Sequence, residues 1–93
     1  MEEIRKICAL MAADLRGYRV VLFGSRAAGA ARERSDFDVG VLGETPLPLA
    51  IFYKMEDLFE EIETLYKIDW VDLNRASSEF RREALTKTEA LYG

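Results

Sequence analysis

Three short runs of β-branched and aromatic residues alternate with stretches of helical periodicity, and this alternation limits the chain to a small α/β fold. The predicted strands cover residues 18–23, 36–42 and 68–73. The predicted helices cover residues 2–16, 25–31, 47–66 and 77–91. The resulting order, α-β-α-β-α-β-α, predicts an α/β (or α+β) domain with a small mixed sheet of about three strands and flanking helices.

Each of the three longer predicted helices has one apolar side, which we expect to face the core. In the first helix these residues are Ile4, Ile7, Cys8, Met11 and Leu15, and Gly17 follows as a helix-ending glycine. In the helix over 47–66 they are Phe52, Met55, Phe59, Ile62 and Tyr66. In the last helix they are Phe80, Ala84, Leu85 and Leu91. The other side of helix 47–66 is acidic (Glu56, Asp57, Glu60, Glu61 and Glu63) and is interpreted as a solvated surface.

The length of 93 residues provides for one domain, 1–93, with one modest core. No window approaches the ~20 apolar residues that a membrane-spanning helix needs. The acidic start of the chain does not resemble a secretory signal. We therefore expect a cytoplasmic protein that makes no membrane contact. The single cysteine, Cys8, cannot form an internal disulfide and is expected to be a small core residue.

The chain contains no histidine and has a net charge of −4. The commonest general base and the commonest zinc ligand are therefore both missing. Any chemistry must depend on carboxylates, hydroxyls, lysine or arginine. The acidic balance also argues against broad, charge-driven binding of nucleic acid.

The segment between the first two predicted strands combines groups that bind phosphate with groups that bind metal. Gly24 and Ser25 follow a strand and lead into a predicted helix start, where exposed backbone N–H groups bind phosphate. Arg26 adds a positive charge. Asp36 and Asp38 are two residues apart on a strand, so both carboxylates point the same way, and hard oxygen ligands of this kind suit Mg²⁺. A phosphate-binding loop beside paired carboxylates predicts phosphoryl transfer.

Each of these features also has a simpler explanation when it is taken alone. A Gly-Ser pair after a strand is commonly a turn, and two aspartates can form a solvated strand face. Their combination at this spacing favours the functional interpretation. Arg32 and Arg34 either face solvent or contact phosphates, and Trp70 is expected to pack in the core or at an interface rather than to stack on a base.

The pattern G-S-x-x-x-G-x-x-x-x-x-S-D-x-D resembles the signature of the minimal nucleotidyltransferases (MNT), small members of the DNA polymerase β-like superfamily. The matching residues are Gly24, Ser25, Gly29, Ser35, Asp36 and Asp38. The resemblance covers essentially the whole chain and implies the nucleotidyltransferase fold. It also implies Mg²⁺ and transfer of a nucleoside monophosphate from an NTP, most often ATP, with release of pyrophosphate. Gly24, Ser25, Arg26 and Ser35 would then bind the nucleotide, while Asp36 and Asp38 would hold the metal ions.

A third carboxylate of the family lies on the next strand between hydrophobic residues. Here Asp69 and Asp72 are both candidates, and because they are three residues apart they point to opposite faces of the strand. Alternation alone does not choose between them. The family pattern selects Asp69, which would complete the metal site or accept the proton of the acceptor. Asp72 would then cap backbone N–H groups near Asn74.

The resemblance also suggests a partner. Many MNT proteins are paired with a helical HEPN-domain protein in toxin–antitoxin modules, where the MNT chain is the antitoxin and attaches AMP to a tyrosine of the toxin. We expect no second domain for the acceptor, so the acceptor site is expected to come from the acceptor itself or from a second subunit, as in a homo-oligomer. Two alternatives are a partner subunit that binds nucleotide or neutralises a toxin without catalysis, and a fragment of a small-molecule nucleotidyltransferase. The missing second domain disfavours the fragment.

Overall fold

The computed structural model describes residues 2–23, 37–62 and 68–93, which contain three helices and four strands. In chain order the elements are α1 (Glu2–Leu10), β1 (Arg19–Phe23), β2 (Phe37–Leu42), α2 (Leu49–Glu60), β3 (Ile68–Asp72), α3 (Ser78–Ala84) and β4 (Glu89–Tyr92). The short helix predicted over 25–31 lies outside the described residues. Within the described ranges, no helix combines the length and the apolar character needed to cross a membrane.

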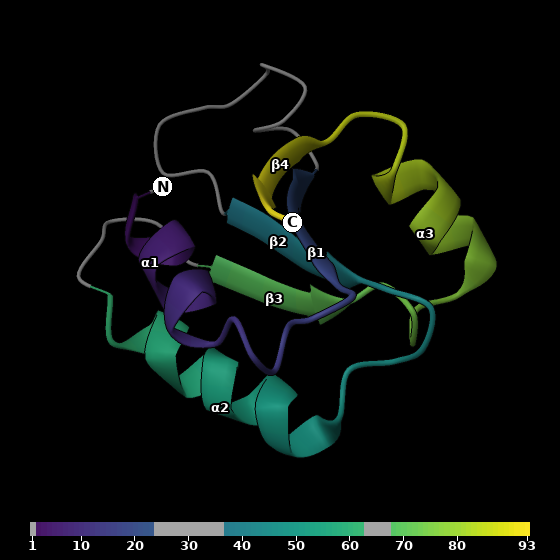
Figure 1. Cartoon of the computed structure of the whole chain (residues 1–93). Helices are drawn as coiled ribbons and strands as arrows, with labels where there is room; N and C mark the ends of the chain where they lie inside the picture. Colours follow the sequence, from purple (N-terminus) through teal and green to yellow (C-terminus); the bar gives the residue numbers. More distant parts are fainter. Residues whose placement is uncertain (1, 24–36, 63–67) are drawn as a thin grey trace.

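The four strands form one mixed sheet in the order β3-β2-β1-β4 (Figure 1). β1 pairs antiparallel with both β2 and β4, whereas β2 and β3 run parallel. Parallel neighbours need a crossover connection, and α2 is the helix of that connection between β2 and β3. The expected mixed sheet is confirmed, with one strand more than the sequence indicated.

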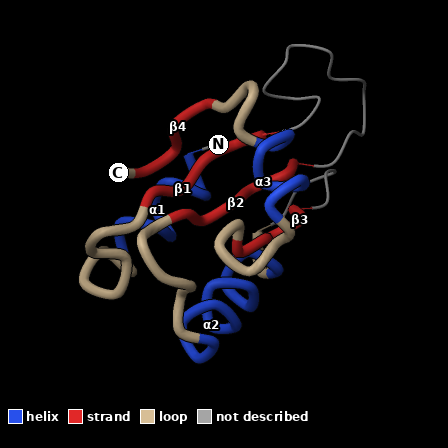
Figure 2. Tube along the Cα trace, turned by 90° about the vertical axis from the view of Figure 1, so that its right-hand side faces the viewer, coloured by secondary structure: helices blue, strands red, loops and turns tan. Residues whose placement is uncertain are grey.

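Helices pack on both faces of the sheet, with α1 and α2 on one face and α3 on the other (Figure 2). Side chains alternate along a strand, so β1 contributes to two clusters. The larger cluster, on the face of α1 and α2, contains Ile4, Ile7, Cys8, Met11, Leu15, Val20, Leu22, Val39, Val41, Leu47, Met55, Phe59, Trp70 and Leu91. The smaller cluster, on the face of α3, contains Val21, Phe23, Leu73 and Ala84.

The first helix ends at Leu10 rather than at residue 16. Beyond that point the backbone tightens, since the Met11 N–H donates to the carbonyls of both Ile7 and Cys8. Met11 is nevertheless buried, as predicted, and so is Leu15 farther along the turn. The segment ends at Gly17, whose φ of +84° is in the region that favours glycine.

Cys8 is fully buried in the larger cluster, which confirms its expected core position. Burial disfavours the charged thiolate. The pKa of the Cys8 thiol is therefore raised to about 11 from its ordinary value of 9.0.

The middle helix has the predicted apolar and acidic sides over a shorter length. Met55 and Phe59 are buried, and Phe52 and Ile62 pack against the same cluster. On the acidic side Asp57, Glu60 and Glu61 are exposed, whereas Glu56 is half-buried. Glu63 and Tyr66 lie outside the described residues.

The prediction of one helix over 77–91 is wrong beyond Ala84. Ser77 caps α3 by accepting a hydrogen bond from the Phe80 N–H at 3.1 Å, and the helix is only two turns long. Residues 89–92 instead form β4, which pairs with β1. Ala84 and Leu91 are buried as predicted, but Phe80 and Leu85 are exposed. The ladder of hydrogen bonds offered by β1 outweighs the helical preference of Glu89, Ala90 and Leu91.

Candidate active site

Asp38 on β2 and Asp69 on β3 lie side by side across the parallel strand pair. Neighbouring strands are ~4.8 Å apart, and register partners direct their side chains to the same face. The residues next to them, such as Val39 and Trp70, pack in the cluster of α1 and α2. The two aspartates therefore face the α3 side of the sheet, where both are half-buried.

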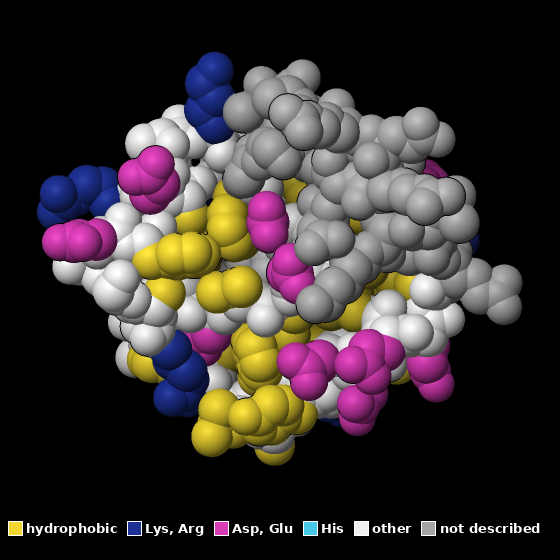
Figure 3. Space-filling model, turned by 180° about the vertical axis from the view of Figure 1, so that it is seen from behind, with side chains coloured by type: hydrophobic (Ala, Val, Ile, Leu, Met, Phe, Trp, Pro, Cys, Tyr) yellow, Lys and Arg dark blue, Asp and Glu magenta, His cyan; other side chains and the backbone are white. Residues whose placement is uncertain are grey.

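Both aspartates line a pocket of about 750 Å³. That volume is within the range of sites for small molecules and cofactors. The described lining residues are Phe23, Asp38, Glu56, Phe59, Glu60, Ile62, Ile68, Asp69, Trp70, Val71 and Phe80. Seen from behind, the molecule presents acidic and hydrophobic side chains close together on one face (Figure 3).

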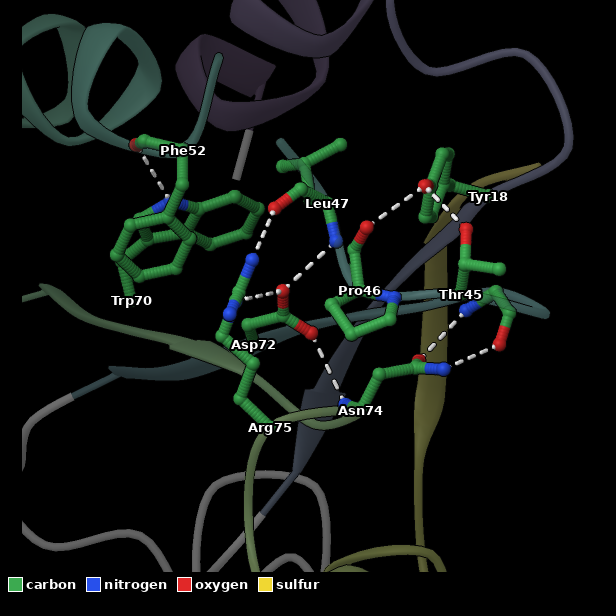
Figure 4. A network of polar contacts seen from close by, with 10 residues as sticks. Tyr18, Thr45, Pro46, Leu47, Phe52, Trp70, Asp72, Asn74 and Arg75 are labelled. Atoms are coloured by element: carbon green, nitrogen blue, oxygen red, sulfur yellow. Dashed lines mark hydrogen bonds and ion pairs between the residues drawn. The ribbon is translucent and has the colours of Figure 1, made fainter. Parts of the chain in front are cut away.

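Asp72, the other candidate for the third carboxylate, lies on the opposite face. Its register partner is Val41, and its side chain is only 4% exposed. The Asp72 carboxylate accepts hydrogen bonds from the backbone N–H groups of Leu47 at 2.8 Å and Asn74 at 2.9 Å (Figure 4). Arg75 Nε lies 3.4 Å from the same carboxylate. Asp72 is thus occupied by structural contacts, and its predicted capping of the chain near Asn74 is confirmed.

Further hydrogen bonds join the segment after β2 to the segment after β3. The Asn74 side chain accepts from the Gly43 N–H at 2.9 Å and donates to the Gly43 carbonyl at 2.7 Å. Arg75 donates to the Leu47 carbonyl at 3.2 Å (Figure 4). The Asn74 and Arg75 contacts hold the carboxyl ends of β2 and β3 together, at the ends of the strands away from Asp38 and Asp69. The Tyr18 hydroxyl donates to the Pro46 carbonyl at 3.1 Å and so ties the segment before β1 to the segment after β2.

Trp70 is a packing residue, as predicted from the sequence. It is buried, and its indole N–H donates to the Phe52 carbonyl at 3.0 Å. The Phe52 ring stacks on it with centroids 5.4 Å apart, and the Phe59 ring meets it edge-on at 5.0 Å. These contacts fix α2 against β3, next to Asp69.

Gly40 shares the face of Asp38 and allows a close approach of side chains over β2. A Cβ atom at this position would lie 2.8 Å from Leu73 Cδ1 and 3.1 Å from Phe23 Cε1. Any side chain here would displace the two hydrophobic residues that cover the sheet beside Asp38.

The other site residues predicted from the sequence are not described by the structure. Gly24, Ser25, Arg26, Ser35 and Asp36 all lie in the segment between Phe23 and Phe37, outside the described residues, as do Arg32 and Arg34. Within residues 2–23, 37–62 and 68–93, no group of three or more His, Cys, Asp or Glu side chains is arranged to hold a metal ion.

Of the described pocket residues, sequence reasoning assigned only Asp38 and Asp69 to the site, and Glu56, Glu60 and Phe80 are among those it missed. Glu56 and Glu60 are four residues apart on a helix and so lie on one side of it. That spacing is visible in the sequence, but their position at the pocket depends on how α2 packs against β3. Phe80 was assigned to the core because it fits the helical period of the last predicted helix.

A family model described as polymerase beta, nucleotidyltransferase matches residues 5–93. A protein of Haemophilus influenzae (strain ATCC 51907 / DSM 11121 / KW20 / Rd), named "Probable protein adenylyltransferase MntA", is 29% identical over 80 residues, which are 86% of this chain and 70% of that protein.

Solved structures share the fold. The crystal structure of a toxin–antitoxin with AMP-PNP matches with a TM-score of 0.70 and 25% identity, over 100% of this chain and 74% of that chain. A second structure contains a tri-AMPylated HEPN toxin of Shewanella oneidensis in complex with an MNT antitoxin. It matches with a TM-score of 0.65 and 23% identity, over 99% of this chain and 71% of that chain. At that identity, the second match shows the fold alone.

Proposed function

The chain belongs to the polymerase beta nucleotidyltransferase family, and from this premise we propose that it transfers a nucleoside monophosphate from an NTP to an acceptor hydroxyl. One observation carries the proposal. Asp38 and Asp69 are register partners on parallel strands and line one pocket of about 750 Å³. A pair of carboxylates in a pocket of this size suits a reaction in which charge on a triphosphate must be neutralised.

We propose ATP as the nucleotide and a tyrosine hydroxyl of a HEPN-domain partner as the acceptor, so that the chain acts as an antitoxin. The similar Haemophilus protein is named as an adenylyltransferase, and a similar solved structure contains AMP-PNP. Another holds an AMPylated HEPN toxin beside an MNT antitoxin. Because ATP is supplied in the cytoplasm, we propose that the chain acts there.

The residues of the site fit a divalent cation, and we propose Mg²⁺. Two half-buried carboxylates share one face of the sheet, and hard oxygen ligands are those that Mg²⁺ prefers. Asp38 and Asp69 would hold the ion together with Asp36, which precedes Asp38 by two residues on the same predicted face. When bound, the ion would neutralise charge on the triphosphate and orient it.

The remaining roles follow from the chemistry of each residue. Gly24 leaves room for a phosphate to approach the backbone, Ser25 and Ser35 donate hydroxyl hydrogen bonds, and Arg26 adds positive charge. Asp69 is also the proposed acceptor of the proton that leaves the attacking hydroxyl. Asp72 is assigned no part in the reaction, because its carboxylate is engaged by Leu47, Asn74 and Arg75 on the other face.

The test is transfer of label to the partner. The chain is incubated with ATP labelled at the α-phosphate, Mg²⁺ and a HEPN-domain protein, and label on that protein is quantified. We expect label on a tyrosine, located by mass spectrometry, and its loss in Asp38→Asn and Asp69→Asn. Asp57→Asn is the matched control, since Asp57 is an exposed acidic residue of α2 that does not line the pocket.

The same assay distinguishes the non-catalytic alternative. A subunit that neutralises its partner by contact alone would inhibit the partner without labelling it. The Asp38→Asn and Asp69→Asn variants of such a subunit would inhibit the partner as well as the wild type does. That combination of results would replace catalysis by binding as the function of the chain.

A further inference from the structure

Phe80, in the first turn of α3, is a large hydrophobic residue that is 46% exposed although it lines the pocket of Asp38 and Asp69. We propose that the Phe80 ring stacks on the nucleobase of the NTP. Phe80 is then a binding residue that positions the nucleotide for transfer. This inference rests on the proposed function, because it assigns one part of the substrate to one part of the same pocket.

Contacts on one side fix the place of Phe80 relative to Asp38. Its ring meets the Phe23 ring edge-to-face, with centroids 6.0 Å apart and an interplanar angle of 87°. Phe23 is buried and is the register partner of Asp38. The Phe80 N–H is held by the Ser77 hydroxyl. Phe80 is therefore tied to β1, the strand that pairs with β2 and places Phe23 opposite Asp38.

The perpendicular contact leaves an aromatic face of Phe80 available. In an edge-to-face pair, one ring contributes an edge and the other a single face. Whichever part Phe80 contributes, at least one of its faces is not covered by Phe23. The high exposure of the side chain agrees with this. A flat apolar surface in a pocket can accept a flat partner by stacking.

The nucleobase is the part of an NTP that matches this surface. The triphosphate is highly charged and belongs with metal ions and N–H groups, whereas the base has an uncharged π-face. On the α2 side, the pocket carries Glu56 and Glu60, whose negative charge disfavours phosphate. Among the described lining residues, α3 contributes Phe80, which carries no charge. The base is thus placed toward α3.

Stacking on an aromatic ring tolerates different bases. Phe80 therefore contributes affinity for purine nucleotides without choosing between them. ATP and GTP should lose affinity to a similar extent when the ring is removed. Any preference for adenine would come from other residues.

The experiment measures the dissociation constant of AMP-PNP with Mg²⁺ for the wild type, Phe80→Ala, Phe80→Leu and Phe80→Trp. We expect the Kd to rise roughly 5- to 150-fold for Ala and Leu, the size of a base–aromatic stacking contact, and to change less than about twofold for Trp. Tripolyphosphate with Mg²⁺, which has no base, should bind all four proteins equally. Leu85→Ala is the control, since Leu85 is an exposed apolar residue just after α3 that does not line this pocket.

Several outcomes would overturn the assignment. An unchanged Kd for AMP-PNP in folded Phe80→Ala and Phe80→Leu, with a raised KM for the protein acceptor, would place the acceptor rather than the base against Phe80. Equal loss of tripolyphosphate affinity would mean a general disturbance of the pocket. If the Kd for AMP-PNP is unchanged in Phe80→Ala and Phe80→Leu while the wild type transfers AMP, only the assignment of Phe80 to the base fails. If the folded wild type binds no nucleotide and labels no partner, the proposed function fails with it.

Discussion

Asp69 lies directly beside Asp38 in the parallel register, whereas Asp72 lies beside Val41 on the other face of the same two strands. The three-residue separation of the two aspartates on β3 places them on opposite faces, and the register decides which of them can act together with Asp38. The Asp72 carboxylate, which is turned away from Asp38, is engaged by two backbone N–H groups and Arg75.

The first prediction contrasts these two residues. Asp69→Asn should reduce the rate of AMP transfer by several orders of magnitude, because Asp69 is both a proposed metal ligand and the proposed proton acceptor. Asp72→Asn should retain most of the transfer activity per folded molecule. It should lower the free energy of unfolding by ~1–3 kcal/mol, since a buried carboxylate that accepts two backbone bonds is replaced. Transfer assays with parallel thermal denaturation measure both effects. If Asp72→Asn loses more transfer activity than Asp69→Asn, the third carboxylate of the site is Asp72 instead.

The second prediction concerns the metal. ATP binding should weaken strongly when Mg²⁺ is chelated, because the clustered carboxylates repel the triphosphate without a cation. The double variant Asp36→Asn/Asp38→Asn should lose turnover and retain its fold. Calorimetry with and without chelator measures the binding, and full activity of the double variant would contradict the site assignment.

The third prediction concerns the glycine that follows β1. Gly24→Val should abolish nucleotide binding without unfolding the protein, because its side chain would occupy the approach of a phosphate to the backbone. Ser25→Ala should weaken binding less, since the backbone donors are retained. The affinity for AMP-PNP and the circular dichroism spectrum are the measurements. ATP affinity that is unchanged in Gly24→Val would place the phosphate elsewhere.

The fourth prediction concerns the close approach over β2. Gly40→Ala should reduce the free energy of unfolding by ~1–3 kcal/mol, because the added methyl group would lie 2.8 Å from Leu73 Cδ1. In a Leu73→Ala background the same substitution should cost less, since the atom it meets is gone. Denaturant unfolding of the four proteins gives the coupling energy. If the losses in free energy of unfolding for Gly40→Ala and Leu73→Ala simply add in the double variant, a steric clash with Leu73 is excluded as the cause.

The fifth prediction concerns pH. The pKa of the buried Cys8 thiol is raised to about 11 from 9.0, so between these values the unfolded chain has released a proton that the folded chain retains. Stability therefore falls as the pH rises from about 9 toward about 11. The decline should be shallower in Cys8→Ala, in which the other titrating groups are unchanged. Identical pH slopes for the two proteins would mean that Cys8 contributes nothing to the decline.

The elements that sequence predicts well are those whose pattern is local. The alternation of Phe37, Val39 and Val41 identified the buried face of β2, and Met55 and Phe59 identified the buried side of α2. Asp72 was predicted to cap the chain near Asn74, and it does so. Its burial, and its bond to Leu47, could not be predicted because Leu47 is distant in sequence.

The elements that sequence predicts poorly are those set by partners far along the chain. Glu89, Ala90 and Leu91 favour a helix locally, and they become β4 only because β1 provides a pairing edge. Likewise, side-chain alternation separates Asp69 from Asp72, but only the register of β3 on β2 shows that Asp69 lies beside Asp38. Phe80 fits the helical period of the last predicted helix, but only the packing of α3 on the sheet shows that it lies half exposed at the pocket.

The late position of β4 in the chain has a consequence for synthesis on the ribosome. β1 emerges early and pairs with β2, but its other edge receives its partner only after α2, β3 and α3 have been made. An apolar strand with an open edge is a template for pairing with another chain. During translation, this edge of β1 therefore stays open to pairing with another chain until β4 has been made.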